Sequence, residues 1–134
     1  MAVLSANKVL SLLKFGLVLL LASSYSVFPE ESGSVVVIRM TNEMKFVPSH
    51  VTVKVGQTVE WVGEPDGPSH NVTTDPDKVV DPGHVSFPRG AKPFDSGIIK
   101  SGKSFRHTFT MPGVYRYVCQ PHEGVMKGEV TVTE

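Results

Sequence analysis

The chain has 134 residues, which is room for one domain of ordinary size and an N-terminal extension. Its 12 glycines and 10 prolines favour a fold rich in turns and argue against a helical bundle. The 13 basic and 13 acidic residues give a formal net charge of zero, and no Lys/Arg block could contact a row of phosphates, so we expect no nucleic-acid partner.

The N-terminal segment, residues 1–26, resembles an export signal. Lys8 and Lys14 come before an apolar run, and serines follow that run, in the order typical of a cleaved signal peptide. The alternative is a retained membrane anchor over residues 9–27, in which apolar residues on both sides of Lys14 reach spanning length. We therefore expect an exported protein in the periplasm or another extracytoplasmic space, which contacts a membrane only if this segment is not cleaved.

Residues 27–34 are expected to form a short polar linker, and residues 35–134 a single folded domain. In this domain, short segments rich in β-branched and aromatic residues alternate with turn signals, and no long stretch has helical periodicity. We predict strands at 35–40, 51–55, around 59–61, and at 71–74, 103–110, 114–118 and 128–133. The pattern predicts an all-β fold, namely a Greek-key β-sandwich of about seven or eight strands.

Several features of the domain are expected to have structural roles. Residues 75–97 are dense in Pro, Gly and Asp, which predicts a long surface excursion with room for one helical turn. The histidines His50, His84 and His107 are expected to be ordinary surface or strand residues, although contact of His84 with a metal site stays open. The aromatic residues expected in the core or on a sheet face are Phe46, Trp61, Phe105, Phe109, Tyr115 and Tyr117.

One segment near the C-terminus, YVCQPHEGVMKG, combines three side chains that bind metals. Cys119, the only cysteine, ends a predicted strand, His122 follows three residues later, and Met126 four residues after that. A loop can curl round an ion, whereas a strand would send successive side chains to opposite faces. His70 follows a turn rich in Pro and Gly, from which an end loop of a sandwich could meet the Cys119 loop. The sequence thus predicts a metal site of two imidazoles, one thiolate and one thioether.

The donor set distinguishes between the two metals that bind cysteine and histidine most often. Thiolate and thioether are soft donors, and one Cys with two His and a weak axial Met is the pattern of electron-transfer copper sites. Structural zinc uses thiolates, imidazoles or carboxylates and rarely a thioether. Met126 therefore favours copper over zinc.

The segments GPSHNV and MPGVYRYVCQPHEGVMKGEVTV resemble the plastocyanin, amicyanin and pseudoazurin branch of the cupredoxins, which are blue (type 1) copper proteins. The resemblance covers the whole predicted domain. It implies that His70, Cys119, His122 and Met126 bind one copper ion, and that Asn71 ties the two ligand loops together beside the sulfur. Three residues separate His122 from Met126, whereas plastocyanins typically have four and amicyanins two.

The same resemblance implies where electrons leave the protein. In this family the second ligand histidine reaches the surface through a hydrophobic patch. The residues expected to form the electron exit and the partner docking face are Pro121, His122, Gly124 and Val125.

The function implied is that of a monomeric electron carrier, which cycles one copper between Cu(I) and Cu(II) and meets redox partner proteins in transient complexes. We expect no enzyme activity, because no substrate site is evident. Copper oxidases of the same fold need further copper ions and typically show a His-Cys-His run, whereas Val118 and Gln120 flank Cys119 here.

A copper storage or delivery protein is the remaining alternative. Such a protein would favour exposed clusters of Met or His that release the ion readily. Met40, Met44 and Met111 are instead scattered along the sequence.

Overall fold

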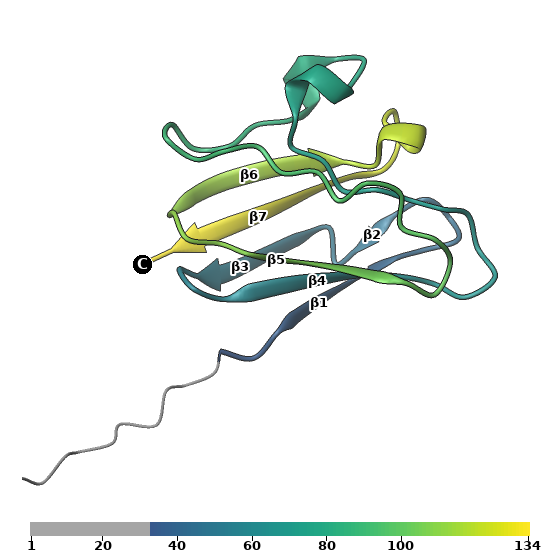
Figure 1. Ribbon diagram of the computed structural model, residues 1–134, viewed down its shortest axis with the longest axis horizontal. Coiled ribbons are helices and arrows are strands. Elements are labelled where there is room, and N and C mark those ends of the chain that lie inside the picture. Colours follow the sequence, from purple (N-terminus) through teal and green to yellow (C-terminus); the bar gives the residue numbers. More distant parts are fainter. Residues whose placement is uncertain (1–32) are drawn as a thin grey trace, which may run out of the picture. The chain divides into compact units, whose positions relative to one another are not determined.

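The computed structural model describes residues 33–134 (Figure 1). The predicted signal peptide or anchor, residues 1–26, and all but the last two residues of the predicted linker, 27–34, lie outside the described residues. The strands are β1 (Val36–Met40), β2 (Phe46–Val47), β3 (His50–Lys54), β4 (Thr58–Gly63), β5 (Ser104–Thr108), β6 (Gly113–Val118) and β7 (Lys127–Thr133). Three short 3₁₀ turns complete the described elements: η1 (Pro76–Lys78), η2 (Pro82–His84) and η3 (Gln120–His122).

The strands form two sheets, one in the order β2-β1-β4-β5 and the other in the order β3-β7-β6. Each sheet contains one parallel pair, β1 with β4 and β3 with β7, and its other pairs are antiparallel. The chain passes from one sheet to the other between β2 and β3, between β3 and β4, and between β5 and β6. This arrangement confirms the predicted all-β sandwich, with seven strands in the described residues.

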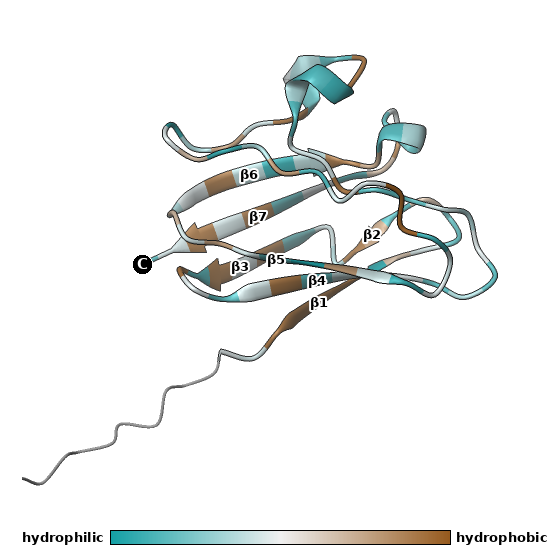
Figure 2. Cartoon of the chain, in the orientation of Figure 1, coloured by the Kyte–Doolittle hydropathy of each residue, from teal (hydrophilic) through white to brown (hydrophobic). Residues whose placement is uncertain are grey.

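The core lies between the two sheets and is built from alternate residues of each strand. In β4, Val59, Trp61 and Gly63 are buried while their neighbours are partly exposed, as the two-residue period of a strand requires. The ring of Trp61 meets the edge of the Tyr117 ring from the opposite sheet, with 5.4 Å between the ring centroids. The same alternation appears as changing colour along the strands in Figure 2. The aromatic residues named from the sequence all belong to this core, with Phe105 partly buried at its margin.

One predicted strand, at residues 71–74, is wrong. This segment makes single bridges instead: His70 pairs with Ile99, and Thr73 pairs with both Asp95 and Val118. Its residues favour extended backbone, but the segment touches each neighbouring stretch only briefly, so no ladder of hydrogen bonds develops. The sequence also missed β2, because two residues are too few to show a period.

The excursion over residues 75–97 is present, with two 3₁₀ turns where one helical turn was expected. Each turn starts at an Asp-Pro pair. The side chains of Asp75 and Asp81 accept hydrogen bonds from the N–H groups of Asp77 and Gly83, at 3.0 and 2.8 Å. These bonds satisfy donors that a helix start leaves free. Within residues 33–134, no helix has the length and apolar character needed to cross a membrane.

Close packing at Gly128 gives a test of the core. A Cβ atom at Gly128 would lie 2.4 Å from the buried ring of Tyr117. Gly128→Ala should therefore destabilise the protein by about 1–3 kcal/mol, because the ring must shift within a packed core. Gly124→Ala is the control, since a Cβ there meets no atom within 4 Å. The free energy of unfolding in denaturant measures both effects, and equal losses for the two variants would contradict this packing.

Candidate metal centre

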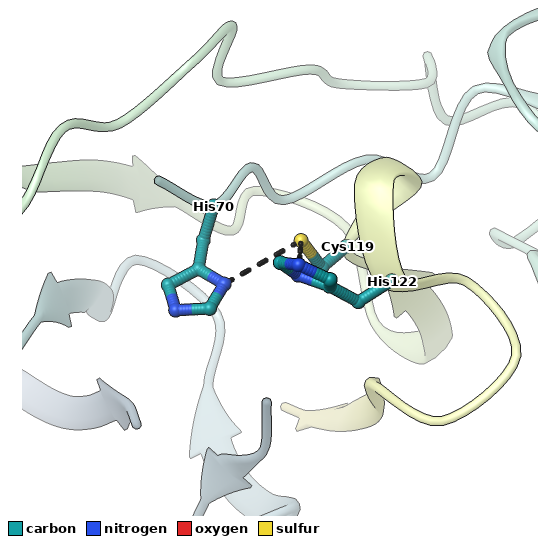
Figure 3. A group of neighbouring side chains, drawn as sticks. All are labelled: His70, Cys119 and His122. Carbon is teal, nitrogen blue, oxygen red and sulfur yellow. Dashed lines mark hydrogen bonds between the residues drawn. The ribbon is translucent and has the colours of Figure 1, made fainter. Parts of the chain in front are cut away.

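His70, Cys119 and His122 converge at one end of the sandwich. One ligand atom from each side chain lies within 4.8 Å of the other two. The Cys119 Sγ is 3.7 Å from Nδ1 of His70 and 3.4 Å from Nδ1 of His122, so both rings direct the same nitrogen toward the sulfur (Figure 3). The two ring centroids are 5.2 Å apart. The three residues that the sequence singled out are thus brought together by the fold.

The ligand loop, residues 119–126, owes its shape to backbone hydrogen bonds. The N–H of His122 donates to the carbonyl of Cys119 at 3.0 Å, which closes the η3 turn. The N–H groups of Val125 and Met126 both donate to the carbonyl of His122, at 3.0 and 2.9 Å. The N–H of Cys119 in turn donates to the carbonyl of Met126 at 3.0 Å. The loop therefore closes on itself where β6 ends and β7 begins.

His70 reaches the site from a different part of the chain. Its N–H donates to the carbonyl of Ile99 at 3.0 Å, and the N–H of Ile99 donates back to His70 at 2.7 Å. This single antiparallel bridge fixes the backbone at His70 while leaving the side chain directed at the sulfur. The side chain is almost completely buried, at 1% exposure.

Asn71 joins the two ligand segments. Its backbone N–H lies 3.4 Å from the Cys119 sulfur, to which it donates. Its side-chain Oδ1 accepts a hydrogen bond from the N–H of Gln120 at 2.6 Å. Asn71 is buried, so both bonds are shielded from water. This is the linking position that the resemblance implied.

Burial favours the uncharged form of both His70 and Cys119 when no metal is bound. Burial lowers the pKa of His70, and the neighbouring His122 acts in the same direction, which favours the neutral imidazole that metals bind. Burial raises the pKa of the Cys119 thiol, although the N–H groups of Asn71 and His122 offset part of this rise. A metal would compete with the thiol proton, so binding is expected to release it. Two imidazole nitrogens and one sulfur that face a common point fit a copper ion.

Met126, the fourth candidate, is fully buried at the base of the ligand loop. Its backbone is bonded to His122 on one side and to Cys119 on the other. The three-residue spacing after His122 therefore places a buried methionine whose backbone is bonded to the two other candidate ligands of the loop.

The residues expected in the docking face lie on the outside of this loop. Pro121 and Gly124 are exposed, Val125 is 69% exposed, and His122 is half-buried. Of the two candidate histidine ligands, His70 is thus buried and His122 approaches the surface.

Sequence reasoning missed the role of Glu123 and left the role of His84 open. Glu123 is only 8% exposed, and its carboxylate accepts hydrogen bonds from the N–H of Val80 and of Asp81 and from Nδ1 of His84. The N–H groups of Val80 and Asp81 lower the pKa of this carboxyl to about 2. No local pattern pointed to this, because Glu123 and its partners are about 40 residues apart in the chain. His84 thus contacts the ligand loop through Glu123.

Comparison with known proteins agrees with this geometry. Residues 34–133 match the family described as copper binding proteins, plastocyanin/azurin family. Plastocyanin of Scenedesmus fuscus is 38% identical over 88 residues, which cover 65% of this chain and 85% of that protein. Chloroplastic plastocyanin of Physcomitrium patens is 34% identical over 122 residues, covering 85% and 67%.

Solved structures give the same result. The crystal structure of amicyanin from Paracoccus versutus superposes with a TM-score of 0.57 at 29% identity, covering 75% of this chain and 83% of that one. With the sandwich fold and the three converging ligand residues, these matches confirm the predicted copper cofactor. The chain belongs to the plastocyanin/azurin family of copper-binding proteins.

Proposed function

We propose that this protein carries single electrons between redox partners outside the cytoplasm by means of one type 1 copper ion. The observation that carries the proposal is the convergence of His70, Cys119 and His122 on one point at the end of a rigid sandwich. Membership of the plastocyanin/azurin family supports it.

We assign the ligands as His70 Nδ1, His122 Nδ1, Cys119 Sγ and, as a weak axial donor, the thioether of Met126. The two nitrogens and the sulfur already face one another, and Met126 is buried in the same loop. A copper ion held there would take up and give back one electron, the chemistry for which this soft donor set is known.

The protein's own contribution is to keep the ligands still. Cys119 and His70 are buried, and backbone hydrogen bonds hold them in two segments that Asn71 joins. A site fixed in this way changes little in geometry when the charge of the metal changes. Packing at the density of a protein interior makes such movement costly in free energy. The fold thus supports fast electron exchange by limiting rearrangement.

Partners would dock at the exposed end of the site. His122 is half-buried there, with Pro121, Gly124 and the strongly exposed Val125 around it. A small apolar face of this kind suits brief contacts with a redox protein, in which rapid release matters more than affinity. We propose that the protein works as a monomer, because the docking face must stay free.

Two alternatives are less well supported. A storage or delivery protein needs ligands that release the metal easily, whereas Cys119, His70 and Met126 are all buried. A catalytic role would need a place for a substrate at the metal, and the residues beside His122 form an exposed face suited to a protein partner. We therefore propose a carrier that has no substrate of its own, exported by its N-terminal segment.

Removing the thiolate tests the copper assignment. Wild-type protein given Cu(II) should show an intense visible absorption from charge transfer between thiolate and copper, and Cys119→Ser should abolish it. His50→Gln is the control, because His50 is an exposed residue on β3, and this variant should keep the colour. A wild-type protein that stays colourless with Cu(II) would contradict the assignment of a thiolate-bound copper.

Changing the axial position tests the fourth ligand. Met126→Leu should keep most of the colour and raise the reduction potential, since losing a weak axial donor disfavours the oxidised ion. Met111→Leu, at a partly buried position before the start of β6 and so at the opposite end of that strand from Cys119, is the matched control and should leave the potential unchanged. Voltammetry of the copper-loaded proteins measures both. If the two variants share the wild-type potential, Met126 is not the axial ligand.

A further inference from the structure

Glu123 connects the ligand loop to the excursion. One carboxylate oxygen, Oε2, accepts from the N–H of Val80 at 2.7 Å. The other, Oε1, accepts from the N–H of Asp81 and lies against Nδ1 of His84, both at 2.9 Å. Charge-assisted bonds of this kind are about twice as strong as neutral ones. Three donors from one segment thus meet a single side chain of the ligand loop.

His84 extends this contact back into the excursion. Its second nitrogen, Nε2, lies 3.4 Å from a carboxylate oxygen of Asp81. The imidazole ring therefore bridges Asp81, which starts η2, and Glu123, which follows η3. The bridge makes η2 and the ligand loop one connected unit.

These bonds are the main polar attachment of this part of the excursion. Before it, Lys78 pairs with Asp95 at 3.1 Å, and after it, Ser86 exchanges backbone hydrogen bonds with Arg116. Between them, in residues 79–85, every hydrogen bond to another described segment ends on Glu123. The segment and the loop thus depend on each other.

The ligand loop needs support at the same place. Gly124 and Val125 are exposed, and the N–H of Val125 bonds only to the carbonyl of His122 in its own loop. Such bonds shape the turn without fixing it to the body of the protein. Glu123, which follows His122 directly, supplies that fixed point.

We propose that Glu123 is a positioning residue for His122, which holds the exposed ligand in place by fastening the peptide after it to residues 80–84. The role rests on the proposed function, because it concerns His122 as a copper ligand. This proposal also assigns a role to the excursion, because residues 80–84 would hold the exposed side of the site in place.

The experiment compares Glu123→Ala with Glu129→Ala in the copper-loaded protein. Glu129 is a suitable control, because it is a carboxylate in β7, partly buried, that pairs with Arg116 rather than with the excursion. Amide hydrogen exchange in the Cu(I) state reports on the bonds to Glu123. The EPR spectrum of the Cu(II) state and the rate of copper loss to excess chelator report on His122.

Glu123→Ala should speed exchange at the amides of Val80 and Asp81 by about tenfold or more, because each loses a charged acceptor. It should also change the EPR spectrum and release copper several-fold faster than Glu129→Ala, which should match wild type in all three measurements. Unchanged exchange at both amides would show that Glu123 does not fasten the ligand loop to Val80 and Asp81. Faster exchange with a wild-type spectrum and release rate would overturn the positioning role.

Glu123→Gln covers the case in which the alanine variant does not fold. Glutamine keeps the size of the side chain and one acceptor oxygen, but it turns an NH₂ group toward one of the two backbone donors. The same changes are expected to a smaller degree, and a variant identical to wild type in exchange and EPR would overturn the proposal. A wild-type protein without blue colour would overturn the proposed function itself. That result is distinguishable from a failure of the Glu123 proposal, because it involves no Glu123 variant.

Discussion

The buried sulfur of Cys119 is the point on which the site depends. It lies at the end of β6, receives the N–H of Asn71, and faces the rings of His70 and His122. A buried sulfur without these neighbours would be an ordinary apolar group. Because they come from two distant segments, the site exists only when both sheets are correctly packed. The geometry of the ligands therefore depends on the same packing that stabilises the fold.

The core provides the stiffness that this sulfur needs. Tyr117 lies two residues before Cys119, and its ring packs against the ring of Trp61 between the sheets. Gly128, on the neighbouring strand β7, leaves room for the Tyr117 ring. The end of β6 is thus held by large packed rings on one side and by β7 on the other. Movement at the sulfur would require movement of these buried, packed side chains. His122, in contrast, lies at the margin, and the bonds that hold it run from the next residue, Glu123, to Val80, Asp81 and His84.

The sequence predicted those features that are local. Three of the four ligand candidates lie within eight residues of one loop, and the strands around them show the period of two clearly. The sandwich and the copper cofactor followed from these patterns and from the family resemblance, and both are confirmed. The bridge segment after His70 was misread as a strand, because extended backbone gives the same pattern whether or not a ladder forms. The contact between Glu123 and the excursion could not be predicted, since charged residues are normally exposed and nothing in the sequence marks this one as buried.

The placement of β7 has a consequence for how the protein acquires its metal. This strand is the middle one of its sheet, and its parallel partner β3 lies far back in the chain. The loop that carries Cys119, His122 and Met126 ends where β7 begins. Pairing across such a sequence separation is slow, because the chain must lose much freedom before the contacts form. A copper-binding geometry should therefore arise late in folding, so that partly folded chains present a lone thiol rather than a finished site to free copper.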